Sequence, residues 1–416
     1  MIDLFQTRNF RLLWVASLLS SIGDTILLIA MPFYLYQQTG SAKAIGLVFI
    51  VEMIPRLIIS APAGVFVDRW NKVQTMIVCD VLRALLMGIL TIVALYPEYL
   101  SLLFPVCFMT SGLQQFFGPA GESLIPEVAG IGRMQNANAL GSIANNLNRV
   151  VGPFAGGMVI VYLGFAGTVL INALTFVASA TLLHMIRDVG TKSEYGQDIL
   201  IQEKHNGDNE SSRIGNVLAE WRSGVRLIGN DRIISVVFIC MALLMVGQGF
   251  LNIALAPFVY NVLRDGPVAF AWIASAQGIG GLIGAAFVGK LGQLLPARLL
   301  VGISASISGS IMYAMYSMTS LPIIVVLSCL AGIPTALFLV SMSTLVLMRS
   351  PTTARGRIQG SLQTVQAAFL ITGLVVCTVL IDSLGEANIL RIMSLFILSA
   401  GILALSIMPK SASFQT

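Results

Sequence analysis

Hydrophobic residues occupy most of the chain in long runs, and short polar segments separate these runs. A bilayer core about 30 Å thick needs about 20 apolar residues per helix, and twelve runs approach or exceed that length. The predicted spans are residues 12–36, 45–67, 73–96, 100–117, 138–162, 166–185, 233–262, 268–291, 299–318, 321–348, 358–381 and 388–408. The pattern therefore predicts an all-α membrane protein with twelve transmembrane helices.

A polar segment at residues 188–232 divides the twelve spans into two groups of six. It is rich in Asp, Glu, Lys, Asn, Gly and Ser, which is typical of linkers. We therefore expect an N-terminal six-helix bundle at residues 1–187, a cytoplasmic linker at 188–232 and a C-terminal six-helix bundle at 233–416. Apolar residues at helical spacing in 214–228 indicate a helix, which lies either on the membrane surface or against the cytoplasmic ends of the bundles.

Two short segments of the first half recur in similar form in the second half. Residues 64–72 resemble 289–298, and residues 133–140 resemble 355–362. Two pseudo-symmetric halves of six helices are typical of secondary transporters, whose binding site lies near the membrane midplane between the halves. The repeat therefore predicts a transporter for a small molecule.

The composition agrees with a membrane protein and disfavours several other classes. Charged residues make up only 10% of the chain and the mean hydropathy is +0.87, whereas soluble proteins average about 25% charged residues. The basic residues are scattered singly despite a net charge of +5, so we expect no nucleic-acid partner. The cysteines lack metal-binding spacing, and His184 and His205 lie far from any embedded nucleophile, so neither a metal site nor an enzyme is expected.

Most of the 24 Lys and Arg residues fall on one side of the twelve-span arrangement. Cytoplasmic loops of membrane proteins carry an excess of basic residues. We therefore expect both termini to be cytoplasmic, in a monomeric, multi-pass protein of the bacterial inner or plasma membrane.

Charged side chains are rare within apolar runs, because each costs roughly 2.5–3.5 kcal/mol at the centre of a transmembrane helix. Those of the first half are Asp24, Glu52, Arg56, Asp80, Arg83 and Arg149. They must face a protein interior or a water-filled path. An embedded carboxylate can take up and release protons, so the candidates for proton coupling are Asp24 and Glu52, with Arg56 and Arg149 as basic partners. Asp80 and Arg83 lie three residues apart, and they either form a structural pair or take part in proton coupling.

Amides replace embedded charges in the second half. In a membrane such side chains line a cavity or form hydrogen bonds between helices. The candidate residues of a substrate cavity are Gln114, Gln248, Asn252, Gln277, Gln363 and Gln366. On this interpretation the N-terminal half couples protons, and the C-terminal half mainly shapes the substrate pocket.

The segment between the second and third spans contains a family signature. Gly64, Asp68, Arg69 and Lys72 match the pattern G-x-x-x-D-R-x-x-R/K of the major facilitator superfamily, although Val73 replaces the usual final basic residue. The sequence resembles this superfamily over nearly its whole length, which implies its fold of two six-helix bundles. The resemblance also implies that Asp68 and Arg69 latch the cytoplasmic ends of the halves in one state of the transport cycle.

Further segments resemble the drug:proton antiporter branch of this superfamily, which contains macrolide efflux proteins and the enterobactin exporter. They are residues 9–14, 20–24, 118–120, 124–127 and 136–140. In the fifth span, Gly152, Pro153, Gly156 and Gly157 match the end of the antiporter signature, but its two upstream glycines are replaced. The basic residue that many proton-coupled relatives carry in the fourth span is also missing.

The resemblance implies multidrug-type efflux, the export of a drug-like or amphipathic metabolite by alternating access in exchange for protons. The proton is then the coupling ion, and no other cofactor is expected. The main alternative is an uptake permease for a small anionic nutrient, which the basic residues near the midplane would bind. A non-transporting membrane receptor is a further alternative.

Overall fold

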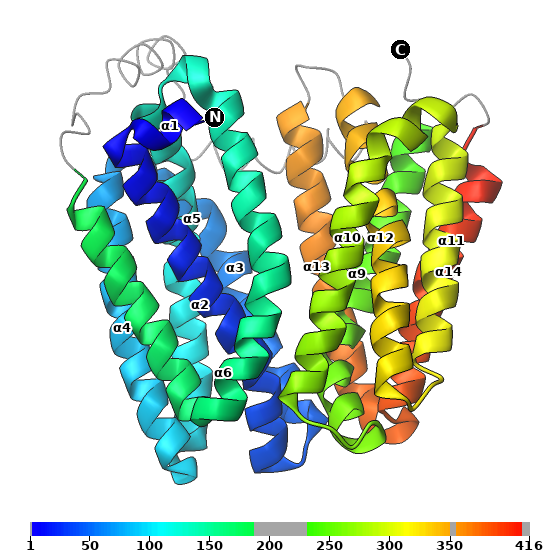
Figure 1. Cartoon of the computed structure of the whole chain (residues 1–416), viewed down its shortest axis with the longest axis horizontal. Coiled ribbons are helices and arrows are strands. Elements are labelled where there is room, and N and C mark those ends of the chain that lie inside the picture. Colours follow the sequence, from blue (N-terminus) through cyan, green and yellow to red (C-terminus); the bar gives the residue numbers. More distant parts are fainter. Residues whose placement is uncertain (1, 187–230, 350–354, 410–416) are drawn as a thin grey trace.

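The computed structural model describes residues 2–186, 231–349 and 355–409, and its regular elements there are helices. The first half contains α1 (Ile2–Gln6), α2 (Arg8–Thr39), α3 (Ala42–Arg69), α4 (Lys72–Leu95), η1 (Pro97–Leu102), α5 (Leu103–Ala129), η2 (Ile131–Arg133) and α6 (Met134–His184). The second half contains α9 (Arg232–Pro257), the π-helical η3 (Phe258–Val262), α10 (Pro267–Leu294), α11 (Ala297–Met315), α12 (Leu321–Arg349), α13 (Arg355–Leu384) and α14 (Glu386–Ile407). Figure 1 shows the two sets of helices side by side.

The predicted linker lies outside the described residues, except for its last two positions. The same holds for the helix expected at 214–228. The domain boundaries on either side of this segment therefore stay a prediction.

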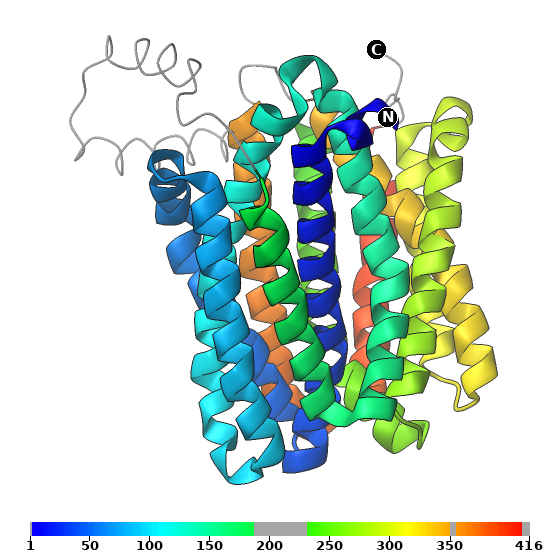
Figure 2. The same ribbon diagram turned by 60° about the vertical axis from the view of Figure 1, so that its left-hand side comes forward.

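The described helices agree with the predicted number of spans. Ten are long and apolar enough to cross a membrane, and α3, bent by 53° between Ala42–Ser60 and Pro62–Arg69, makes an eleventh. Helix α6 has 51 residues and would be about 77 Å long if straight, more than twice the bilayer core. It breaks at Gly164, whose φ of 67° favours glycine, and Figure 2 shows its two arms on either side of α2. Counted as two spans, α6 brings the arrangement to the twelve expected helices.

The fourth predicted span, residues 100–117, is wrong at its C-terminal end. Helix α5 continues to Ala129, with Pro119 and Pro126 inside it. Prolines usually end helices in water, but membrane helices tolerate them because neighbouring groups satisfy the freed backbone atoms. The longer helix carries Glu122 within the bundle, at a position where the prediction had placed a loop.

Glycine allows close helix packing in the C-terminal half. A Cβ atom at Gly280 of α10 would lie 1.9 Å from the carbonyl oxygen of Cys329 in α12, and one at Gly284 would lie 2.3 Å from that of Ile333. No side chain fits at either position without moving a backbone. The two glycines therefore hold α10 and α12 in direct backbone contact, as small residues do in membrane bundles.

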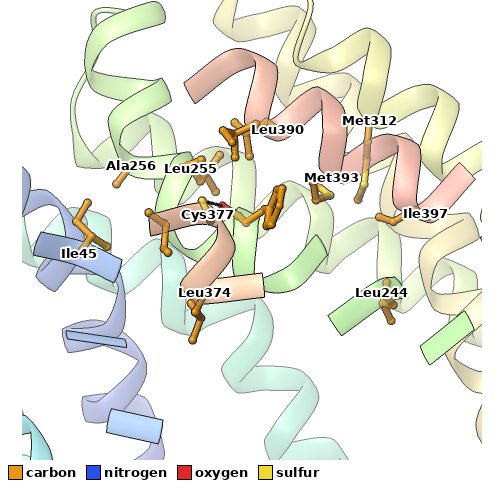
Figure 3. Packing of buried hydrophobic residues seen from close by; sticks show 14 of the residues in the cluster. Ile45, Leu244, Leu255, Ala256, Met312, Leu374, Cys377, Leu390, Met393 and Ile397 are labelled. Carbon is orange, nitrogen blue, oxygen red and sulfur yellow. Dashed lines mark hydrogen bonds between the residues drawn. The ribbon is translucent and has the colours of Figure 1, made fainter. Parts of the chain in front are cut away.

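The two halves meet at the end of the molecule where α2 ends and α3 begins. Lys43 of α3 forms an ion pair with Asp382 of α13, with an Nζ–Oδ2 distance of 2.7 Å. Asn261 of η3 donates hydrogen bonds of 2.6 Å to the Tyr36 hydroxyl and to Glu386 Oε1. Figure 3 shows apolar packing in the same region, where Ile45 of the N-terminal half lies near Ala256 of α9. These contacts close one end of the interface between the halves.

The described residues at the opposite end give a different picture. Among the described residues, no side chain there forms an ion pair or a side-chain hydrogen bond to a described residue of the other half. Farther in, Ser275 of α10 donates a hydrogen bond of 3.2 Å to the carbonyl oxygen of Val150 in α6. The described parts of the two halves are therefore joined at one end and along α6 and α10.

Candidate functional site

A cavity of about 630 Å³ lies within the N-terminal half. Its wall is formed by α2, α3, α4 and α5, and it has the volume typical of sites for drug-sized ligands. Most of the wall is apolar and includes several methionine and leucine side chains. The charged residues that border it are Asp24, Glu52, Arg56, Arg83 and Glu122.

Arg83 and Asp24 form the central ion pair of this cavity. Nη2 of Arg83 lies 2.7 Å from Oδ1 and 2.6 Å from Oδ2 of Asp24, and Nη1 donates to the Ser20 hydroxyl at 3.3 Å. The Arg83 side chain is 2% exposed, whereas that of Asp24 is 35% exposed. The guanidinium group also stacks on the Phe176 ring, 4.0 Å from its centroid. The pair thus links α2 to α4 and presents the Asp24 carboxylate to the cavity.

Asp80 lies on the other side of the same guanidinium group. It is fully buried, and its Oδ1 lies 3.7 Å from Nη1 of Arg83. Within the described part of the chain, neither Asp80 oxygen has a hydrogen-bond partner. The spacing of Asp80 and Arg83 correctly indicated a local pair, but it gave no sign of the stronger contact with Asp24. Two carboxylates therefore share one positive charge.

The other charged groups of the cavity are not paired with one another. No ion pair joins Glu52, Arg56 or Glu122 to any described residue. Glu52 and Arg56 stand four residues apart on α3, but their charged ends do not come within 4 Å of each other. The Ser111 hydroxyl donates to the backbone oxygen of Glu52 at 2.6 Å, which fixes α3 beside α5.

Arg149 lies apart from the cavity, although it was grouped with the proton-coupling candidates. It is exposed on α6, and its carbonyl oxygen lies against Gly278 of α10. Its neighbour Asn148 reaches the helix that carries Asp24, since Nδ2 donates to Thr25 Oγ1 at 2.9 Å. The sequence placed Arg149 within a membrane span, and the rotation of α6 about its axis turns its side chain away from the cavity.

The glycines of the predicted antiporter signature are packing positions. A Cβ atom at Gly152 would lie 2.5 Å from Cγ2 of Thr25, and one at Gly156 would lie 3.2 Å from the Cα of Ile26. A Cβ atom at Gly157 would lie 2.3 Å from that of Ala271 in α10. The remaining residue of the motif, Pro153, is buried within α6. This segment thus packs α6 against α2 and against the other half.

The amide candidates lie in two different environments. Gln114 borders the cavity. The five amides of the C-terminal half do not border the cavity. Gln248 and Asn252 are hydrogen-bonded to each other, and Gln366 contacts a methionine sulfur at 3.6 Å. Gln277 is half-buried and Gln363 is exposed. Their part in a substrate pocket stays a prediction.

The predicted gating motif lies at the junction of α3 and α4. Lys72 pairs with Glu127 of α5 and donates a hydrogen bond of 3.3 Å to the Ser123 carbonyl oxygen. Asp68 and Arg69 are exposed, and neither forms an ion pair or side-chain hydrogen bond with a described residue. A Cβ atom added at Gly64 would meet no other atom within 4 Å. Lys72 therefore links α4 to α5 within the N-terminal half, and the latch function of the motif stays a prediction.

Glu122 is the charged residue of the cavity wall that the sequence did not reveal. The prolines around it indicated a helix end, and Leu124 and Ile125 form too short an apolar segment to indicate that the span continues. Among the described residues, no group of three or more His, Cys, Asp or Glu side chains is placed to hold a metal ion. The charged groups that border the cavity are carboxylates and guanidinium groups.

Solved structures of transporters share the fold of this chain. A bacterial homologue of the iron transporter ferroportin in an inward-facing state has a TM-score of 0.73 and 15% sequence identity, covering 96% of this chain and 97% of that chain. A bacterial homologue of the lysosomal transporter Spinster, in an inward-facing and occupied conformation, has a TM-score of 0.74 and 13% identity, covering 96% of each chain. The fold is that of a major facilitator transporter.

Sequence comparisons place the chain within a family of that class. The family model described as "Transmembrane secretion effector" matches residues 3–414, and the chain belongs to this family of multi-pass membrane transporters. The multidrug efflux pump Tap of Mycolicibacterium fortuitum is 25% identical over 94% of each chain. Macrolide efflux protein A of Streptococcus pyogenes is 24% identical over 72% of this chain and 73% of its own length.

Proposed function

We propose that this protein exports amphipathic, drug-like small molecules across the bacterial plasma membrane in exchange for protons, by alternating access. The similarity to multidrug and macrolide efflux pumps supports export of such compounds. The observation that carries the proposal is the cavity whose wall presents Asp24, ion-paired with Arg83. An ionisable carboxylate then stands where both a drug-sized molecule and a proton can reach it.

The two carboxylates around Arg83 give a physical route to coupling. With Asp24 and Asp80 both ionised, two negative charges would share one positive charge in the membrane interior, which is costly. We therefore expect the carboxylates of Asp24 and Asp80 to share one proton while Arg83 stays positively charged. When that proton resides on Asp24 instead of Asp80, Arg83 loses its partner on α2 and keeps the one on its own helix. Breaking the link between α2 and α4 biases the equilibrium between transport states.

One proton supplies enough free energy for useful export. A charge that crosses a membrane potential of 100 mV yields about 2.3 kcal/mol, and each unit of pH difference adds about 1.4 kcal/mol. Exchange of one proton for one neutral molecule can then sustain a gradient of roughly 100-fold to 1000-fold.

The distribution of basic residues supports cytoplasmic termini. With that orientation, the end closed by Lys43, Asp382 and Asn261 faces outward. The exposed Asp68 and Arg69 then lie at the cytoplasmic end, without partners among the described residues of the other half. On this proposal the structure represents an inward-facing state that loads substrate from the cytoplasm, in a protein that works as a monomer.

Transport into everted membrane vesicles tests the coupling. We expect an imposed proton gradient to drive ethidium uptake, and Asp24→Asn to abolish the gradient-driven component while exchange of labelled for unlabelled ethidium continues. Asp265→Asn, in an exposed loop of the other half, is the matched control. Uptake that continues undiminished after an uncoupler has collapsed the gradient, or full gradient-driven uptake by Asp24→Asn, would contradict proton exchange.

A further inference from the structure

The charges of the cavity do not balance. Asp24 is held by Arg83, which leaves Glu52, Glu122 and Arg56 without an ion pair to any described residue. Two carboxylates and one guanidinium group of the cavity wall thus lack an ion-pair partner among the described residues. Asp80 is fully buried beside Arg83 and is itself acidic, so it does not make the site more positive. The cavity therefore offers a net negative site to whatever enters it.

We propose that this cavity binds amphipathic cations, and that Glu52 and Glu122 are the carboxylates that receive the positive charge. This inference rests on the proposed function and narrows its substrate class. It also disfavours the small anionic nutrient of the alternative interpretation, because an anion would meet more carboxylates than guanidinium groups.

The carboxylates of Glu52 on α3 and Glu122 on α5 lie at different depths in the membrane, and positions along α5 measure the difference. The hydrogen bond from Ser111 places Glu52 level with that residue of α5. Glu122 lies eleven residues farther along the same helix, about 16 Å away at 1.5 Å per residue. Beyond it, the pair of Lys72 and Glu127 marks the end of the helix. A cation that enters from this end therefore passes Glu122 before it reaches Glu52.

The rest of the wall suits the apolar part of such a ligand. Met31, Met53 and Met87 border the cavity from three different helices, and Phe49 adds an aromatic face. Methionine side chains are flexible and polarisable, so they adapt to ligands of different shape. The hydroxyl of Thr110 also borders the cavity, and it is buried without a hydrogen-bond partner among the described residues. It can therefore bond to a polar group of the ligand.

Equilibrium binding of two ions of the same shape and opposite charge tests the proposal. The purified full-length protein in lipid nanodiscs is titrated with tetraphenylphosphonium and, separately, with tetraphenylborate. We expect tetraphenylphosphonium to bind more tightly, and Glu122→Gln and Glu52→Gln each to weaken its binding by about tenfold, as expected for the loss of one charge partner in a partly desolvated site. Binding of tetraphenylborate should be unchanged or tighter in both variants.

The controls separate charge from folding. Glu98→Gln makes the same chemical change in η1, outside the cavity, and should leave both affinities unchanged. Glu122→Lys should weaken cation binding further and strengthen anion binding. If Glu52→Gln does not fold, as judged by size-exclusion chromatography, the two Glu122 variants still decide the matter.

Several results would overturn the inference: equal losses for both ions, unchanged cation binding in Glu122→Gln, or preference of the unmodified protein for tetraphenylborate. Failure of this inference is distinguishable from failure of the proposed function. Proton-driven export of an uncharged compound without charge-dependent cation binding would remove only the cation site. Charge-dependent binding without any proton-driven transport would remove only the exporter.

Discussion

The two halves of this transporter share a helical plan but handle polarity differently. In the N-terminal half, charged side chains lie deep in the spans, and Asp24, Arg83 and Asp80 contact one another there. In the C-terminal half, the described charged side chains lie at or near helix ends, and the interior uses neutral pairs such as Ser308 with Thr335 at 2.7 Å. Among the described residues, carboxylates deep within the spans occur in the first half, whereas close backbone contacts such as that of α10 and α12 characterise the second half.

Removing the guanidinium group should give the largest effect in this comparison. Arg83→Ala leaves the fully buried Asp80 and the cavity-facing Asp24 without a cationic partner. Breaking a buried ion pair in this way costs about 3–5 kcal/mol, so we expect a lower thermal unfolding midpoint in detergent and loss of gradient-driven transport. Arg83→Lys should keep part of the stability because it keeps the charge. Unchanged stability in Arg83→Ala would show that the N-terminal half does not depend on this charge network.

The C-terminal half should be most sensitive to added volume. Gly280→Ala places a Cβ atom 1.9 Å from the Cys329 carbonyl oxygen, and relief of that overlap requires α10 and α12 to separate. We expect a loss of about 1–3 kcal/mol in the free energy of unfolding. Gly281→Ala, next in sequence and with open space around it, is the matched control and should be neutral. Equal effects of the two changes would contradict the close backbone contact.

A smaller effect is expected where the halves meet. The ion pair of Lys43 and Asp382 is solvent-exposed, and such pairs contribute about 0.2–1 kcal/mol. Asp382→Asn should therefore shift the balance of transport states by no more than about fivefold, away from the closed end, as measured by the distance between spin labels on the two halves. The charge-swapped double variant of Lys43→Asp with Asp382→Lys should restore the balance. If the double variant does not restore the balance of transport states, the ion pair of Lys43 and Asp382 does not help to close this end of the interface.

The smallest effect compares two amides. Gln114→Leu alters the cavity wall and should change tetraphenylphosphonium affinity by about threefold. Gln248→Leu breaks only a local hydrogen bond to Asn252 in the other half and should leave that affinity unchanged. The reverse result would return the substrate pocket to the C-terminal half, where the sequence alone had placed it.

The helices themselves were predictable to within a few residues. The predicted spans 12–36 and 268–291 correspond to Arg8–Thr39 and Pro267–Leu294. Hydrophobic length is a local property, because every backbone polar group in a bilayer must be satisfied within the helix. The failure at the fourth span has the same origin, since Pro119 acts as a local signal of termination that the surrounding helices override.

The charged residues were visible in the sequence, but their partners were not. Asp24 and Arg83 are 59 positions apart, and no spacing rule joins them. Whether two embedded side chains meet depends on how each helix is rotated about its axis and how closely its neighbours approach. The rotation of α6 separates Arg149 from the cavity. Glu52 and Arg56 lie on one helix, and they stay unpaired because their charged ends do not come within 4 Å of each other.

The sequence by itself determined that this chain forms a membrane protein of long apolar helices with a set of costly charges in its first half, because the bilayer penalises both open backbone and unpaired charge. Only the tertiary structure decided that Arg83 stands between two aspartates, that Glu122 joins the cavity and that the C-terminal amides lie outside it. Those outcomes depend on helix bends and rotations that are set by packing between distant segments.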